Sequence, residues 1–146
     1  MPRNVSVDDG GVRYSQIISA GLHRLRGDEP VDAGGSDTGP NPYELLLAAL
    51  GSCASITVRM YADRKQWPLE GVHVELSYGA PHAADSATCD TETRVITGIE
   101  MEISFAGDLS EQQRQRLLEI ANRCPVHRTL TSRIQIHGTL AETAHA

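Results

Sequence analysis

An uncharged stretch in the first half of the chain limits what this sequence can fold into. Residues 45–58, fourteen in number, carry no charged side chain. Asn41 stands before a proline and three residues before Glu44, which is the pattern of a capped helix start. Because Pro68 ends the pattern, the sequence predicts a central helix over 42–66, about 25 residues and 37 Å long. A helix that is apolar on every face is buried on every face, so we expect a second subunit to complete its burial.

The segments around this helix show the period-two alternation of half-buried strands. The alternation predicts N-terminal strands within 12–40, two strands within 72–105 and a C-terminal strand at 133–140. A capping box and an apolar stripe predict a second helix at 110–124. This order of elements is typical of an α+β fold with antiparallel sheets. The length is that of one domain, so we expect a single domain over 1–146.

Charge and cysteine content exclude several classes of protein. Thirteen basic and nineteen acidic residues give a net charge of −6, the opposite of what a nucleic-acid binder carries. The uncharged stretch is shorter than the ~18 apolar residues that cross a bilayer, and the polar N-terminus lacks the apolar core of a signal peptide. Three cysteines are an odd number for a disulfide framework and indicate free or redox-active thiols. We therefore expect a cytoplasmic protein that binds neither nucleic acid nor membrane.

Cys53 lies in a run of small residues, 51–55, in the middle of the predicted central helix. One interpretation is helix packing, because a free cysteine usually behaves as a small buried hydrophobe. The other is a nucleophilic thiolate, which needs a cationic neighbour because a mid-helix position receives no help from the helix dipole. Arg24 and Arg26 are two residues apart in a predicted strand, so both can point to one face, either toward such a site or into solvent.

Cys124 ends the predicted second helix, in the segment Arg-Cys-Pro-Val-His-Arg. The negative end of the helix dipole raises a thiol pKa, whereas the neighbouring arginines and His127 lower it, so the sequence leaves the direction of the shift open. Cys124 is either another buried cysteine or a resolving thiol, which condenses with a sulfenate on a second cysteine to form a disulfide. Only the fold decides whether it meets Cys53.

Metal and phosphate sites are two further possibilities. His82 and Cys89, together with Cys124 and His127, could supply four zinc ligands, although a solvated loop with an incidental thiol is the simpler explanation for the first two. The glycine-rich segment 34–39 lacks the Gly-Lys-Ser/Thr ending of a phosphate-binding loop. We therefore expect neither a metal site nor a phosphate site.

Two motifs taken together resemble those of the OsmC/Ohr family. They are GPNPYELLLAALGSC at 39–53 and CPVHRTL at 124–130, and the similarity extends over nearly the whole chain. The resemblance implies an intertwined homodimer, in which antiparallel sheets from both subunits wrap around two long central helices. It also implies a thiol-dependent peroxidase for organic hydroperoxides and hydrogen peroxide, with sites at the dimer interface. Such a protein holds no cofactor and is reset by an external dithiol reductant, either a protein or a small thiol.

The resemblance gives roles to individual residues. Cys53 matches the peroxidatic cysteine, whose sulfenate would condense with Cys124, the match to the resolving cysteine. Arg26, with Arg24 as second choice, matches the arginine that holds the thiolate. These assignments predict that Cys53, Cys124 and Arg26 take part in catalysis and that Arg24 contacts the substrate.

The chain departs from the family pattern at the glutamate that fixes this arginine. That glutamate lies ten residues before the peroxidatic cysteine, where this chain has Tyr43. Glu44 comes next, about 100° further round the helix. We keep Glu44 as a catalytic candidate and Tyr43 as a substrate-binding candidate. Either Tyr43 hydrogen-bonds in the place of the glutamate or the activating network is absent, as in divergent branches of the family. In the second case the chain is a non-catalytic dimer that binds a small apolar ligand or senses oxidants.

Overall fold

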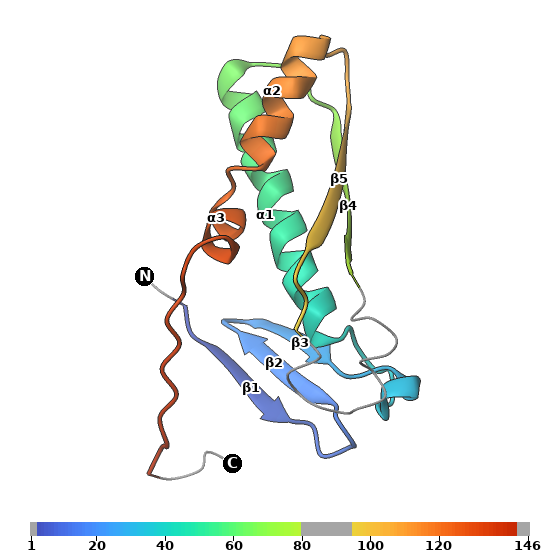
Figure 1. Ribbon diagram of the computed structural model, residues 1–146, viewed down its shortest axis with the longest axis vertical. Helices are drawn as coiled ribbons and strands as arrows, with labels where there is room; N and C mark the ends of the chain where they lie inside the picture. The colour runs from blue at the N-terminus through green and yellow to red at the C-terminus, as the bar shows by residue number, and fades with distance from the viewer. Residues whose placement is uncertain (1–2, 80–94, 143–146) are drawn as a thin grey trace. The chain divides into compact units, whose positions relative to one another are not determined.

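The computed structural model describes residues 3–79 and 95–142, in which strands and helices follow one another in an α+β order (Figure 1). The elements in chain order are β1 (Val5–Asp9), β2 (Gln16–Ala20), β3 (His23–Gly27), the 3-10 helix η1 (Val31–Ala33), α1 (Pro42–Lys65), β4 (Gly71–Tyr78), β5 (Ile99–Ala106), α2 (Glu111–Ala121) and α3 (Pro125–Leu130). The chain divides into two compact units, one formed by 1–52 and 73–104 and the other by 53–72 and 105–146. Helix α1 begins in the first unit and ends in the second.

An antiparallel three-stranded sheet in the order β1-β2-β3 belongs to the first unit. The first strand lies before the predicted range of 12–40, so that boundary was wrong. Residues 12–15 instead form a turn, which the Ser15 amide closes by donating to the Val12 carbonyl at 2.9 Å. The tip between β2 and β3 contains Gly21 at φ 62, a left-handed conformation that glycine adopts without steric cost.

Helix α1 has nearly the ends that the sequence predicts. The Asn41 side chain accepts a hydrogen bond from the Glu44 amide at 2.8 Å, as expected of a helix N-cap. At the other end Gln66 has φ 57, and the Trp67 amide donates back to the Ala62 carbonyl at 2.9 Å. Because this left-handed residue stops the helical ladder, α1 ends at Lys65, one residue before the prediction.

The run of small residues in α1 has a packing function in the first unit. A Cβ on Gly51 would lie 2.7 Å from Leu76 Cδ1 of β4, which is closer than real side-chain contacts allow. Strand β4 therefore approaches the backbone of α1 closely at this glycine. The sequence-based expectation that the small residues admit a neighbouring element is confirmed at Gly51.

One face of α1 is apolar and uncovered in the chain as described. Ala49, Ser52, Ile56 and Met60 are exposed, with Ile56 at 55% and Met60 at 63% of their full accessibility, and their spacing places them along one side of a helix. By length and by a mean hydropathy of 1.5, α1 is also long enough to cross a membrane, with a third of that window buried. The long core helix of a folded domain has the same properties.

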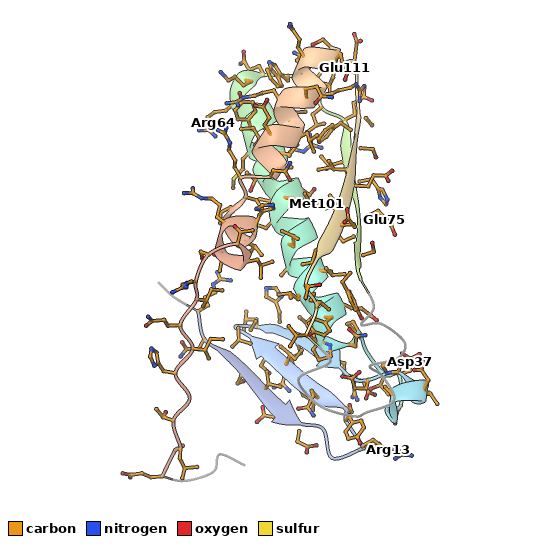
Figure 2. All side chains as sticks on the ribbon, viewed as in Figure 1. Arg13, Asp37, Arg64, Glu75, Met101 and Glu111 are labelled. Carbon is orange, nitrogen blue, oxygen red and sulfur yellow. The ribbon has the colours of Figure 1, made fainter. Side chains whose placement is uncertain are left out.

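Strands β4 and β5 form a two-stranded sheet. Their residues alternate between half-buried and exposed, as predicted from the alternation within 72–105. Glu75 on β4 and Met101 on β5, both labelled in Figure 2, illustrate the two kinds of position, since Glu75 is exposed and Met101 is half-buried. The sheet therefore has one face suited to packing and one to solvent.

In the second unit α2 begins with the predicted capping box. The Ser110 side chain accepts from the Gln113 amide at 3.1 Å, and the Gln113 side chain accepts from the Ser110 amide at 2.9 Å. Leu117 is fully buried on this helix. The helix ends at Ala121 rather than at the predicted 124, because the chain turns there and a separate helix, α3, starts with proline at its first position.

The C-terminal strand predicted at 133–140 is not formed in the described chain. The alternation that suggested it is present, but both of its isoleucines lie in solvent, with Ile134 53% and Ile136 89% exposed. A strand needs a neighbour for its backbone N–H and C=O groups. Alternation alone could not show whether this chain supplies that neighbour, and the described residues do not pair with 133–140.

Candidate functional site

The second unit brings Cys53 and Cys124 together. Cys53 is half-buried on α1, and Cys124 is fully buried immediately before α3. A hydrogen bond joins the Cys124 thiol to the Cys53 side chain. The fold thus answers the question that the sequence left open, because the two thiols lie next to each other within one chain.

The position of Cys124 also decides the direction of its pKa shift. Cys124 is the N-cap of α3, and its Sγ accepts a hydrogen bond from the His127 amide at 3.4 Å. Burial raises the pKa of the Cys124 thiol, the His127 amide opposes this, and the contact with Cys53 raises the pKa further. The net effect is a raised pKa, so Cys124 stays protonated at neutral pH and can donate its hydrogen to the Cys53 sulfur.

Tyr43 and Glu44 lie in the first turn of α1. Tyr43 is half-buried and its ring lies 5.3 Å from that of Tyr78 at a tilt of 45°, an arrangement that aromatic pairs favour. Glu44 is exposed. The two side chains therefore differ in surroundings as the helix geometry predicts, with the tyrosine against the sheet and the carboxylate in solvent.

Arg24 and Arg26 share one face of β3, as predicted from their spacing, and both are exposed. The register places Ile17 of β2 opposite Arg26 and Ser19 opposite Arg24. Arg26 differs from Arg24 in a further contact, because its Nη1 donates to the Ser15 hydroxyl at 3.4 Å. The two arginines are thus distinguishable in the fold although the sequence ranks them only by alignment.

Asp28 is a buried carboxylate in the first unit that sequence reasoning missed. It follows β3 and is only 2% exposed. Its oxygens accept from the Thr38 hydroxyl at 2.6 Å, the Thr38 amide at 3.0 Å and the Glu29 amide at 2.7 Å. These bonds, the Thr38 hydroxyl first, lower the pKa of Asp28 to about 2. Asp28 therefore stays ionised at any physiological pH and holds the glycine-rich loop against the end of β3.

The glycine-rich loop fits around Asp28 because two glycines allow close approach. A Cβ on Gly35 would lie 1.9 Å from the Glu29 carbonyl oxygen, and a Cβ on Gly39 would lie 2.4 Å from the Arg26 carbonyl oxygen. The sequence shows that 34–39 is neither helix nor strand, but it gives no reason for the glycines. The only available signal was an aspartate at the end of a strand, ahead of a loop with many backbone amides.

We expect Asp28→Asn to change how stability depends on pH. Because the folded pKa of about 2 lies below the ordinary value of 3.8, Asp28 stabilises the fold above pH 3.8, and this contribution is lost as the pH falls toward 2. The variant should melt at a lower temperature at neutral pH and lose this part of the acid dependence. Thermal melts between pH 2 and 7 measure both effects. Asp37→Asn, which removes the same charge from an exposed position of the same loop, is the matched control and should leave the profile unchanged.

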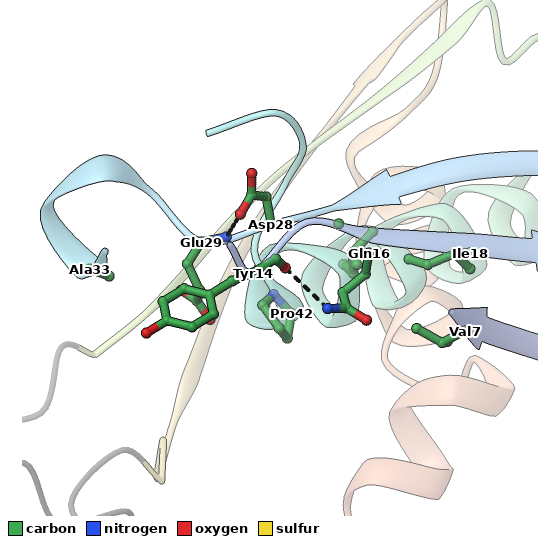
Figure 3. A pocket seen from close by; sticks show the side chains of 10 residues that line it. Val7, Tyr14, Gln16, Ile18, Asp28, Glu29, Ala33 and Pro42 are labelled. Carbon is green, nitrogen blue, oxygen red and sulfur yellow. Dashed lines mark hydrogen bonds between the residues drawn. The ribbon is translucent and has the colours of Figure 1, made fainter. Parts of the chain in front are cut away.

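A cavity of about 560 Å³ opens beside Asp28 (Figure 3). It extends from Val7 on β1 to Leu45 on α1, and its lining combines apolar residues with four polar ones, Tyr14, Gln16, Asp28 and Glu29. Gln16 donates to the Tyr14 carbonyl at 3.3 Å, which fixes the amide at the rim. The volume is that of ordinary small-molecule sites, so the first unit has room for a small apolar molecule.

The zinc alternative falls partly outside the structure. His82 and Cys89 lie beyond the described residues. Within 3–79 and 95–142, no group of three or more histidine, cysteine, aspartate or glutamate side chains is placed to hold a metal ion. Cys124 and His127 do lie together, but through a backbone amide donating to the sulfur rather than through converging side chains.

Comparison with known proteins identifies the family. The model of the family described as OsmC-like protein matches residues 34–137, and the chain therefore belongs to the OsmC-like family. No curated protein matches the chain.

Solved structures show the same fold at low sequence identity. The OsmC-like protein of Mycoplasma pneumoniae is 17% identical, with a TM-score of 0.71 over 89% of this chain and 87% of that one. An organic hydroperoxide resistance protein, OsmC, of Legionella pneumophila is 19% identical, with a TM-score of 0.60 over 90% of each chain. The organic hydroperoxide resistance protein OhrB of Bacillus subtilis is 18% identical, with a TM-score of 0.61 over 90% of this chain and 91% of that one. The α+β fold with antiparallel sheets predicted from the sequence is thus confirmed.

Proposed function

We propose that this protein is a thiol-dependent peroxidase that reduces organic hydroperoxides, with hydrogen peroxide as a second substrate. The contact between the Cys53 and Cys124 thiols carries the proposal, because a peroxidase of this kind needs a second thiol within reach of the oxidised one. Membership of the OsmC-like family supports it. So do the names of two structural neighbours, which describe organic hydroperoxide resistance.

The proposed chemistry needs no cofactor. The Cys53 thiolate attacks one peroxide oxygen, the O–O bond breaks, Cys53 becomes a sulfenic acid, and the other oxygen leaves as an alkoxide that takes up a proton. The Cys124 sulfur then attacks the sulfenic sulfur, an S–S bond forms, and the hydroxyl group leaves with the Cys124 proton as water. An external dithiol reduces this disulfide by exchange and returns both thiols. The raised pKa of Cys124 favours the protonated thiol in the resting protein.

Arg26 is the proposed partner of the Cys53 thiolate, because a guanidinium beside a thiol lowers the thiol's pKa and so supplies the nucleophile. The family resemblance implies this role for Arg26, and the contact of Arg26 with Ser15 distinguishes it from Arg24. Arg24 and Tyr43 are proposed to contact the substrate, and Glu44 is kept as a proposed catalytic residue. The proposed setting is the cytoplasm, where both thiols are kept reduced.

We further propose that two copies form the working protein. Tyr43 and Cys53 are ten residues apart on one continuous helix, about 15 Å along its axis. Tyr43 can therefore lie beside a Cys53 thiol only if that thiol belongs to a second copy. The exposed face of α1, formed by Ala49, Ser52, Ile56 and Met60, supports the same proposal, because folded monomers rarely leave such a continuous apolar stripe in water.

A titration of the reduced protein with cumene hydroperoxide and with hydrogen peroxide tests the function. We expect rapid loss of two thiols per chain, faster with the organic peroxide, and a Cys53–Cys124 disulfide in the peptide masses. Added dithiothreitol should then allow many turnovers. Thiols that persist through a large excess of either peroxide contradict the proposal and favour a non-catalytic dimer that binds a small apolar ligand. Oxidation without repeated turnover favours an oxidant sensor.

A further inference from the structure

We propose that Ser15 and Thr38 connect Arg26 to the buried Asp28 carboxylate through a chain of hydrogen bonds, so that Ser15, Thr38 and Asp28 are positioning residues for the arginine. This hydroxyl relay lies entirely in the first unit. The inference rests on the proposed function, in which Arg26 stabilises the Cys53 thiolate. It also accounts for the absence of a glutamate at Tyr43, since the chain carries a different carboxylate for the same arginine.

The hydrogen atoms of the relay can all point in one direction. Arg26 Nη1 donates to Ser15 Oγ at 3.4 Å. The Thr38 hydroxyl lies 2.6 Å from Asp28 Oδ2 and 3.4 Å from Ser15 Oγ. A hydroxyl has one hydrogen to give, and the short contact to a charged acceptor takes it. The Ser15 hydroxyl is then left to donate to Thr38, so each group between Arg26 and Asp28 accepts from one side and donates to the other.

The two ends of the relay are a cation and an anion, and of the two hydroxyl residues between them Ser15 is buried and Thr38 is exposed. Ser15 and Asp28 are each only 2% exposed, whereas Arg26 is exposed. Hydrogen bonds in such a chain polarise one another and are strengthened where water is excluded. A single long bond to a free hydroxyl would hold an arginine weakly, but here the hydroxyl is tied to a permanently charged group.

The backbone at Ser15 and at Asp28 is fixed by bonds outside the relay. The Ser15 amide and carbonyl bond to Val12 and Gly10, at 2.9 and 2.7 Å. The Asp28 amide donates to the Pro40 carbonyl at 3.1 Å. The Ser15 hydroxyl therefore lies on a backbone held by other bonds, and removing it changes the relay more than the fold.

The relay differs chemically from a direct ion pair. A carboxylate in contact with the guanidinium would neutralise much of its field at the thiolate. Two hydroxyl groups between Arg26 and Asp28 hold the guanidinium in place while keeping the negative charge further away. The remaining guanidinium N–H groups stay available for a thiolate or a peroxide oxygen.

Ser15→Ala and Thr38→Val test the relay through the rate of Cys53 oxidation by cumene hydroperoxide across pH. We expect each variant to slow the reaction by about tenfold at neutral pH and to move the pH profile to higher pH, because a poorly placed Arg26 stabilises the thiolate less. In an Arg26→Gln background neither change should slow the reaction further. Ser19→Ala, on the neighbouring strand opposite Arg24, is the matched control and should behave like the parent protein.

Two results overturn the inference. One is an equal slowing in the presence and in the absence of Arg26, which indicates a structural effect. The other is an unchanged rate and pH profile in both variants. Solvent exchange of the Arg26 guanidinium protons, measured by NMR, gives a readout that does not depend on peroxidase activity. Faster exchange in Ser15→Ala shows the relay even if the parent protein does not react with peroxide, in which case the proposed function fails and the relay stands. Unchanged exchange removes the relay whatever the activity.

Discussion

Cys53→Ser abolishes peroxide reduction, with an expected loss of at least about 1,000-fold in the rate of cumene hydroperoxide consumption in the presence of dithiothreitol. A serine hydroxyl is hardly ionised at neutral pH and is a poor nucleophile toward an O–O bond, whereas a thiolate forms readily. The substitution is small and sits at a half-buried position, so the fold should persist. Peroxide consumption and thermal melting measured on the same preparation separate loss of chemistry from loss of structure.

Cys124→Ser is the matched control for this prediction. It removes the other thiol of the contact but leaves Cys53 in place, so the first peroxide should be reduced and a sulfenic acid should accumulate, detectable with dimedone. Turnover should then slow because the resolving disulfide cannot form. Full turnover in Cys53→Ser would show that another group reduces the peroxide, and an inert Cys53 in Cys124→Ser would show that contact with Cys124 is needed even for the first step.

The central helix could be predicted almost completely because its signals are local. The cap at Asn41, the stop near Pro68 and the uncharged stretch between them act within a few turns of the chain, and α1 follows them closely. The strand at 133–140 shows the limit of the same reasoning. Alternation reports which side chains prefer burial, but a strand forms only where another strand supplies hydrogen-bonding partners.

The two cysteines of the candidate site could be selected from the sequence, but their geometry could not be predicted from it. The motifs single out Cys53 and Cys124, yet their contact depends on the path of the chain through the rest of α1, the sheet of β4 and β5, and α2. The direction of the Cys124 pKa shift required knowing that the residue caps α3 and is fully buried. Burial is a property of the whole fold, and here it outweighs the amide of His127.

Asp28 shows a third kind of limit. Its place at the end of a strand, ahead of a glycine-rich loop, is a weak signal, because its importance comes from hydroxyl and amide donors up to ten residues away. The glycines that allow those donors to approach are visible in the sequence, but a glycine reports only that something comes close and not what it is. Buried carboxylates of this type are found from the structure.

Met60→Glu tests whether the exposed face of α1 is where two copies meet. We expect the parent protein to elute with twice the 15.8 kDa mass of the chain and the variant to elute as a monomer, with dimer affinity reduced by at least about 100-fold, because a buried unpaired carboxylate at an interface costs several kcal/mol. Size-exclusion chromatography with light scattering, over a range of protein concentrations, measures the change.

The control for Met60→Glu has to place the same charge on another exposed apolar residue. Val31, in η1, is 71% exposed, close to the 63% of Met60, and lies away from α1 in the sequence, so Val31→Glu should keep the parent mass. A Met60→Glu protein that remains dimeric contradicts the assignment of this face, since a helix turn carrying a new charge cannot stay buried against its own copy without a compensating cation. A monomeric variant in which peroxide still oxidises Cys53, but at a reduced rate, supports both the peroxidase and the dimer proposal. It shows that the Cys53–Cys124 pair lies within one chain and that the surroundings of the thiolate are completed by the second copy.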